Sequence, residues 1–149
     1  MFVTDVKIKK LRKDAVIPRY GTENSAGADL CVCLEENVGI KPNETKFLPT
    51  GLAMEIPEGL GGFIYARSGL SCKQGLAPAN KVAVIDSDYR GEIMIALHNH
   101  STETKTVEPG QRIAQIVFAP YYKAKFVEVE SLEDSERGTG GFGSVSYTH

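Results

Sequence analysis

The sequence predicts an all-β fold with a closed or double-layered antiparallel architecture, and two observations support this prediction. First, apolar residues alternate with polar ones, which is the period of a strand with one buried face. The alternating stretches are residues 6–9, 52–56, 63–65, 93–97 and 126–130. Second, Pro, Gly and Asn cluster between these stretches, as in residues 41–44 and 57–59, and such clusters are typical of turns. Many short strands separated by turns are typical of β-sandwiches and β-barrels.

One short helix is predicted beside the strands. Ser68 can cap a helix over residues 69–74, and Gly75 can end it in the left-handed conformation. From residue 133 the chain becomes polar and rich in glycine. We therefore expect one β domain over residues 1–132 and a flexible C-terminal arm over residues 133–149.

The bulk composition limits the possible partners. At 149 residues with a formal net charge of −2, the chain is long enough for one domain with a sizeable core and lacks the basic excess of a nucleic-acid-binding protein. It has no apolar run long enough to span a bilayer and no secretory leader at its start. We expect a cytoplasmic protein without membrane or nucleic-acid partners. Its three cysteines, an odd count, argue against a disulfide framework and are expected to be buried.

The most informative segment is residues 80–91. An apolar strand pattern ends on Asp86, and Tyr89 follows three residues later, just before a glycine turn. A strand end is a rigid support for a carboxylate and a flat ring, and catalytic groups need such support because small misplacements are costly. The Asp-x-Asp letters resemble the start of a calcium loop. Arg90 and Leu97 occupy positions five and twelve, where that loop needs oxygen ligands, so this interpretation is excluded.

A glycine-rich segment lies near the C-terminus. Residues 138–143 match G-x-G-x-x-G, but a dinucleotide site needs a following helix and only six residues remain. A backbone strip carrying Arg137, Phe142 and Ser144 suits a phosphate cradle with a base-stacking ring. The alternative is a solvated tail.

Three further fragments carry polar groups suited to a site. Arg67 and a capped helix start could bind an anion, or could be an ordinary capped helix with a surface Arg. Asp29 lies beside small residues that allow close approach. Gln115 is expected on the same strand face as Ile113 and Val117, as either a satisfied core amide or a site donor.

Taken in order, five segments resemble the motifs of the trimeric dUTP diphosphatases. These segments are residues 25–30, 67–70, 85–91, 109–116 and 137–144, and they are spread along most of the chain, from residue 25 to residue 144. The resemblance implies a β jelly roll, a homotrimer that shares its active sites, and hydrolysis of dUTP to dUMP and diphosphate with Mg²⁺. It also implies a cellular role, which is to supply dUMP for thymidylate synthesis and to keep uracil out of DNA.

The resemblance also assigns roles to individual residues. Asp86 would activate the attacking water, and Asp29 would hold Mg²⁺ through a water. Substrate contacts would come from Arg67, Ser68, Gly69, Asn80, Val84, Ile85, Tyr89, Gln115, Arg137, Phe142, Gly143 and Ser144. Two positions depart from the family pattern, because Lys81 and Ala83 stand where glycine is usual.

Two rival functions follow from the same fold. A dCTP deaminase relative would need a catalytic Glu in place of Asp86 and would accept dCTP. A non-catalytic nucleotide sensor would have lost the base or the arm. The chain keeps both Asp86 and the arm, which favours the diphosphatase.

Overall fold

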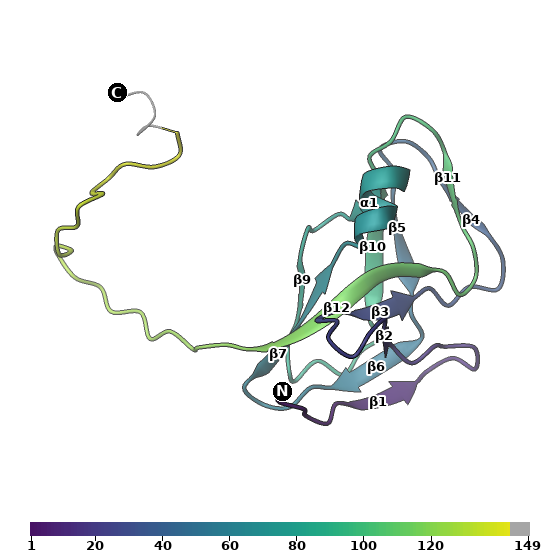
Figure 1. Cartoon of the computed structure of the whole chain (residues 1–149), viewed down its shortest axis with the longest axis horizontal. Helices are drawn as coiled ribbons and strands as arrows, with labels where there is room; N and C mark the ends of the chain where they lie inside the picture. The colour runs from purple at the N-terminus through teal and green to yellow at the C-terminus, as the bar shows by residue number, and fades with distance from the viewer. Residues whose placement is uncertain (144–149) are drawn as a thin grey trace.

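The chain folds into short strands and one helix in a computed structural model that describes residues 1–143 (Figure 1). In chain order the elements are β1 (Lys7–Lys10), β2 (Arg19–Tyr20), β3 (Ala28–Cys31), β4 (Val38–Ile40), β5 (Thr45–Pro49), β6 (Leu52–Glu55), β7 (Leu60–Tyr65), α1 (Ser68–Gln74), β8 (Leu76–Pro78), β9 (Ala83–Ile85), β10 (Met94–Asn99), β11 (Lys105–Val107) and β12 (Arg112–Pro120). Within residues 1–143 no helix is long and apolar enough to cross a membrane.

The strands form four antiparallel sheets. The largest has the order β2-β3-β12-β7-β9, and a second has the order β5-β10-β8. Two pairs complete the fold, β1 with β6 and β4 with β11. These jelly-roll-like sheets confirm the predicted all-β fold with one short helix, although the part of the chain described forms no closed barrel.

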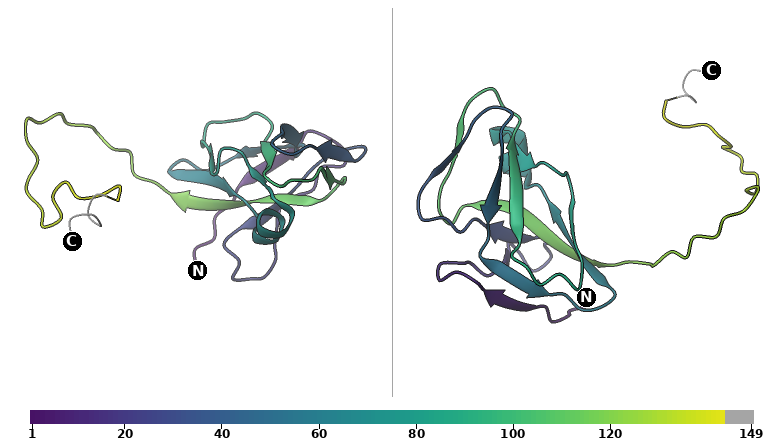
Figure 2. Two further views of the ribbon diagram at one scale, coloured as in Figure 1. Left: turned by 90° about the horizontal axis from the view of Figure 1, so that it is seen from above. Right: turned by 180° about the vertical axis from the view of Figure 1, so that it is seen from behind.

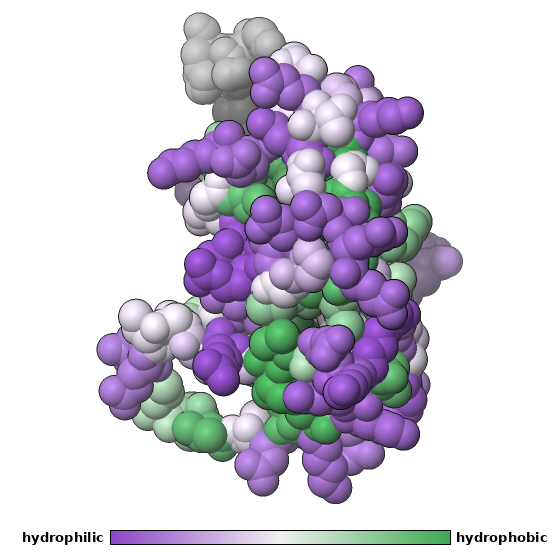
Figure 3. All heavy atoms as spheres, turned by 90° about the vertical axis from the view of Figure 1, so that its right-hand side faces the viewer, coloured by the Kyte–Doolittle hydropathy of each residue, from purple (hydrophilic) through white to green (hydrophobic). Residues whose placement is uncertain are grey.

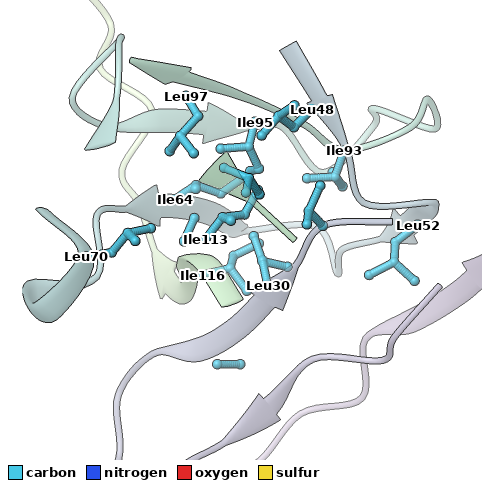
Figure 4. Packing of buried hydrophobic residues seen from close by; sticks show 14 of the residues in the cluster. Leu30, Leu48, Leu52, Ile64, Leu70, Ile93, Ile95, Leu97, Ile113 and Ile116 are labelled. Atoms are coloured by element: carbon cyan, nitrogen blue, oxygen red, sulfur yellow. The ribbon is translucent and has the colours of Figure 1, made fainter. Parts of the chain in front are cut away.

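The core lies between the sheets and follows the alternation expected from the sequence. In β10 the side chains of Ile95, Leu97 and Asn99 are buried, while those between them are more exposed. Figure 4 shows buried aliphatic side chains from α1 and from strands of different sheets pointing toward one another. Burying each such side chain stabilises the fold by about 1.5–3 kcal/mol. The sheets are therefore firm supports for side chains on their outer faces.

The face of the molecule in Figure 3 is mostly hydrophilic, and its largest hydrophobic area lies in its lower half. Cys31 and Cys33 are partly buried, but Cys72 is exposed on α1, so the expectation that all three cysteines are buried is wrong for Cys72. Only Leu70 of this seven-residue helix packs in the core, which leaves the rest of α1 open to solvent.

The predicted cap of the helix is wrong by one residue. Arg67 is the N-cap, with extended backbone (φ −91°, ψ 134°) and no side-chain capping bond, and Ser68 is the first helical residue. The carbonyl of Arg67 already accepts the N–H of Ser71 at 2.9 Å, which is the first bond of the helix. The C-terminal prediction is confirmed, because Gly75 adopts the left-handed conformation with φ 73°.

The C-terminal segment leaves the body of the protein after β12. Figures 1 and 2 show residues 121–143 running away from the sheets. The strand expected over residues 126–130 is absent, and Phe126 is 94% exposed there. An extended segment becomes a strand only beside a partner that takes its backbone hydrogen bonds, and no strand among residues 1–143 lies beside this one. The boundary expected at residue 132 stays a prediction.

Candidate functional site

The first group of candidate residues lies where three strands run side by side. Asp29 on β3 sits between the buried residues Ala28 and Leu30, so its side chain faces outward from the core. In the sheet, Asp29 is opposite Gln115 of β12, and Gln115 is opposite Tyr65 of β7. Because β7 leads directly into Arg67, the sheet brings together three polar residues that are far apart in the sequence.

Direct polar contacts join this group. The Arg67 Nε donates to the Asp29 Oδ1 at 3.0 Å, and the Arg112 Nη1 lies 3.5 Å from the Asp29 Oδ2. The side chains of Arg67 and Asp29 are 26% and 21% exposed. Two guanidinium groups therefore flank one carboxylate in a half-buried setting, which leaves a net positive charge suited to phosphate. Burial raises the pKa of the nearby Cys31 thiol, and the charge of Asp29 adds to this effect.

Gln115 is held in place by two features. Its Nε2 donates to the Ala66 carbonyl at 2.8 Å, just before Arg67. Gly27 leaves the space for its amide, because a Cβ at residue 27 would lie 2.9 Å from the Gln115 Cδ and closer still to its Oε1. The sequence predicts that small residues beside Asp29 allow close approach, and Gly27 does so by leaving room for the Gln115 side chain.

The expected strand face of Gln115 is half right. Gln115 and Val117 share an outer face, but Ile113 is fully buried. The register of β12 against β3 shifts between Arg112 and Ala114, so the side chains before the shift change sides. The alternation of residues along the sequence cannot reveal such a bulge, because alternation assumes that the strand is regular.

The start of α1 adds two exposed residues to the first group. Ser68 and Gly69 are exposed immediately after Arg67, and no atom would lie within 4 Å of a Cβ at residue 69. This turn is therefore open to solvent beside the Asp29 and Arg67 side chains.

The second group follows β9. Val84 points outward and is 61% exposed, whereas Ala83 and Ile85 pack against the core, which confirms the predicted strand. Asp86 comes directly after β9 and is exposed. Its carbonyl accepts the N–H of Tyr89 at 3.1 Å, so a tight turn joins the carboxylate and the ring.

A hollow of about 530 Å³ lies next to Asp86. It is lined by Ile56, Glu58, Asp86, Ser87, Asp88, Arg90, Tyr121 and Lys123. None of the polar residues of the first group lines it. The hollow therefore contains Asp86 but not Arg67 or Arg112, and its own cations are Arg90 and Lys123.

The segment before β9 has the backbone that the family pattern predicts. Lys81 adopts a left-handed conformation, φ 65°, at a position where glycine is usual. Asn80 and Lys81 are both exposed, and the Val82 N–H bonds to the Asn80 carbonyl at 2.7 Å. The turn therefore keeps its shape although a lysine replaces the expected glycine.

The two groups are far apart within one chain. β9 runs antiparallel to β7, and Ile85 pairs with Gly62, which is five positions before Arg67 in the sequence. Asp86 continues β9 by one residue away from Arg67, so six positions along β7 separate Asp86 from Arg67. At about 3.3 Å per residue, six positions separate Asp86 from Arg67 by about 20 Å. The backbone positions of Asp86 and Arg67 are therefore well separated along the sheet.

The arm residues lie away from both groups. Arg137, Phe142 and Gly143 belong to the extended C-terminal segment, and the Phe142 ring is fully exposed. Ser144 lies outside the described residues. The structure of the single chain therefore does not bring the arm together with either group.

The residues present fit a metal held through water. Among residues 1–143 no group of three or more His, Cys, Asp or Glu side chains gathers as a ligand set. Asp29 offers one carboxylate whose two oxygens each face one guanidinium, and a carboxylate has room for further donors such as a metal-bound water. Mg²⁺ commonly keeps several waters and takes other ligands from substrate phosphates, so one carboxylate is an adequate protein contribution.

Three neighbouring residues were not predicted, namely Arg112, Arg12 and Glu92. Arg112 reaches Asp29 only because of the β3–β12 register. Arg12 and Glu92 form an ion pair across 80 positions of sequence, near Tyr89. The sequence offers no local signal for these contacts, because each depends on the register or on a distant segment.

The fold and the two groups define an all-β protein with a pair of guanidinium groups beside one carboxylate and a separate, exposed carboxylate after β9. A family model described as dUTPase matches residues 13–146. The deoxyuridine 5'-triphosphate nucleotidohydrolase of Nautilia profundicola is 51% identical over 140 residues, covering 94% of this chain and 97% of that protein. The chain therefore belongs to the dUTPase family, and it is an enzyme.

Solved structures agree with this assignment. A mutant dUTPase of Staphylococcus bacteriophage 80alpha with dUpNHpp matches with a TM-score of 0.86 and 29% identity, covering 96% of this chain and 99% of that one. A mutant dUTPase of phage phi11 of S. aureus, described with a structural Mg(II) ion, shares the fold at a TM-score of 0.79 and 24% identity. That match covers 88% of this chain and 100% of the phage chain.

Proposed function

We propose that this enzyme hydrolyses dUTP to dUMP and diphosphate, which supplies dUMP for thymidylate synthesis and keeps uracil out of DNA. Membership of the dUTPase family and the name of the Nautilia relative support the substrate. The observation that carries the proposal is the exposed Asp86 carboxylate, fixed after β9 by a turn to Tyr89 and facing a hollow.

Asp86 acts as the general base. Its carboxylate accepts a proton from a water molecule while the water oxygen attacks the α-phosphorus. The bond from the α-phosphorus to the oxygen that bridges to the β-phosphorus breaks, and diphosphate leaves. Such a reaction depends mainly on positioning and on neutralising phosphate charge, so the placement of Asp86 on a strand end suits it.

The first group binds the phosphates. Arg67 supplies a forked donor, Gln115 supplies an amide, and the exposed turn at Ser68 and Gly69 supplies backbone N–H groups. Asp29 would hold Mg²⁺ through a water. When bound, the ion would neutralise charge on the phosphate oxygens and orient the chain of phosphates.

The hairpin before Asp86 selects the nucleoside. The Tyr89 ring packs under the deoxyribose and leaves no room for a 2′-hydroxyl. Asn80 and the backbone at Val84 and Ile85 read the uracil edge, where N3 donates and O4 accepts. Cytosine reverses this pattern, and an unpaired polar group in a closed site is costly. The thymine methyl is excluded by the hairpin wall.

The active enzyme is a homotrimer in which each site is shared. The separation of about 20 Å between the Asp86 and Arg67 backbones along the sheet supports this, because in a shared site the two residues come from different chains and need not be neighbours in one. The exposed alternating stretch at residues 126–130 also supports it, since no strand among residues 1–143 pairs with it. One subunit supplies Asp86, a second supplies Arg67, and the third supplies the arm.

The arm closes over the bound nucleotide. Phe142 stacks on uracil, Arg137 contacts the terminal phosphates, and Gly143 and Ser144 add phosphate contacts. Ordering the arm costs about 1–2 kcal/mol per residue, whereas one stacked base contributes about 1–3 kcal/mol. Stacking alone cannot hold the arm, so the phosphate contacts are needed as well.

Diphosphate release from dUTP, dCTP, dTTP and UTP tests the proposal, with Asp86→Asn as the control. The expected result is turnover of dUTP alone, lost in the Asn variant, which keeps the size of the side chain but cannot accept the proton. Deamination of dCTP would favour a dCTP deaminase relative. Binding of dUTP without turnover would favour a nucleotide sensor.

A further inference from the structure

The loop that follows Asp86 is anchored at its far end by Glu92. The Tyr89 Oη donates to the Glu92 carbonyl at 2.8 Å. Gly91 lies close to the ring, and a Cβ there would be 2.6 Å from the Tyr89 Cζ. The ring that carries the proposed sugar contact is therefore oriented by the backbone of residues 91 and 92.

The Glu92 side chain fixes that backbone to two other segments. Its Oε2 and Oε1 accept from the Arg12 Nε and Nη2 at 3.0 and 3.2 Å, a bidentate pair. The Oε2 also accepts the Gly51 N–H at 2.8 Å, in the turn between β5 and β6. Gly51 in turn accepts the Leu11 N–H at 2.7 Å, which closes a ring of contacts between the N-terminal segment and this turn.

The residue after Glu92 is fixed to the core. Ile93 is 1% exposed, and its N–H donates to the Leu52 carbonyl at 2.8 Å. Its carbonyl accepts the hydroxyl of the buried Thr50 at 2.6 Å. Glu92 therefore stands between a rigid core strand on one side and the exposed loop with Asp86 and Tyr89 on the other.

We propose that Glu92 is a positioning residue whose clamp on Arg12 and Gly51 holds the Tyr89 ring where it discriminates deoxyribose from ribose. This inference rests on the proposed function. The other contacts of the loop are within it or long: the Arg90 Nη1 donates to the Ser87 carbonyl at 2.6 Å, and the Arg90 Nη2 lies 3.9 Å from the Glu55 Oε1. Without the clamp the Glu92 carbonyl can shift, and the phenol shifts with it, which opens space for a 2′-hydroxyl.

The carboxylate of the Arg12–Glu92 pair is less exposed than that of the Lys105–Glu103 pair. The Glu92 side chain is 20% exposed, whereas that of Glu103, which pairs with Lys105 at 3.8 Å, is 80% exposed. The hydrogen bond from Arg12 lowers the pKa of Glu92, so the carboxylate is charged at neutral pH. The Glu103→Gln variant is a matched control, because it removes the same carboxylate charge from an ion pair that does not contact Tyr89.

The test compares Glu92→Gln, Glu92→Ala and Glu103→Gln in the full-length protein, after sedimentation has shown the same assembly for each. The Gln variant keeps an acceptor for the Gly51 N–H and loses the charged pair, and the Ala variant loses both. The readout is the ratio of kcat/KM for dUTP to kcat/KM for UTP. We expect this ratio to fall about threefold in the Gln variant and about tenfold or more in the Ala variant.

The control and a second variant make the outcome decisive. Glu103→Gln should keep the wild-type ratio, and Arg12→Ala should lower it like Glu92→Gln, with no further loss when the two are combined. A ratio within about twofold of wild type in folded Glu92→Gln and Arg12→Ala would overturn the inference while leaving the proposed function intact. Equal use of dUTP and UTP by the wild type would overturn the proposed function itself.

Discussion

Replacing Gly27 with alanine should displace Gln115. The new Cβ would lie 2.9 Å from the Gln115 Cδ and closer still to its Oε1, distances that packed atoms do not tolerate, and its 3.2 Å approach to the Gln115 Cβ would be tight. The backbone of residue 27 is not in the left-handed region, so strain comes from the side-chain contact alone. Gln115 must turn away and lose its bond to Ala66.

The expected loss has two parts. Overpacking costs about 1–3 kcal/mol, and the lost hydrogen bond costs about 0.5–1.5 kcal/mol, so the free energy of unfolding should fall by about 2–4 kcal/mol. Urea unfolding at one fixed protein concentration measures this, because the stability of an oligomer depends on concentration. The KM for dUTP should rise as well, since the Gln115 amide moves away from the phosphates.

Two variants make this test specific. Gly39→Ala is a matched control within a strand, where the nearest atom to the new Cβ is 3.7 Å away, and it should cost much less. In a Gln115→Ala background, Gly27→Ala should cost clearly less, because the colliding amide is gone and only the 3.2 Å contact between the two Cβ atoms remains. An equal cost of Gly27→Ala in both backgrounds would refute the reasoning.

Two further predictions concern acid stability and the arm. The hydrogen bond from Arg12 lowers the pKa of Glu92, so this pair stabilises the fold fully above the ordinary Glu value and loses its effect as pH falls through the lowered value. Urea midpoints between about pH 6 and pH 3 should therefore fall less steeply for Glu92→Gln than for wild type, and parallel curves would contradict this. Separately, trypsin should cut the arm at Arg137 with dUMP present, and a non-hydrolysable triphosphate analogue should slow that cleavage. Equal protection by both ligands would show that the phosphates do not order the arm.

Local sequence patterns predicted those features that depend on neighbouring residues. The alternation through Val84 and Ile85 placed Asp86 at a strand end, and Gly75 marked the end of the helix. The segment 126–130 has the same alternation but forms no strand, because alternation does not say whether a partner strand is present.

Features that depend on distant contacts could not be predicted. The bulge between Arg112 and Ala114 changes which residues share a face with Gln115. The resemblance named Asp86 and Arg67 as parts of one site, but only the β7–β9 register reveals how far apart they lie in one chain.

Mixing two inactive variants tests most directly whether the site is shared between chains. Asp86→Asn and Arg67→Ala would be unfolded together and refolded as mixed trimers. If Asp86 of one subunit works with Arg67 of another, about a quarter of the sites in an equal mixture receive both intact residues, and activity returns to about that fraction. If both residues served the same chain's site, no site would be intact, and the mixture would stay as inactive as its components.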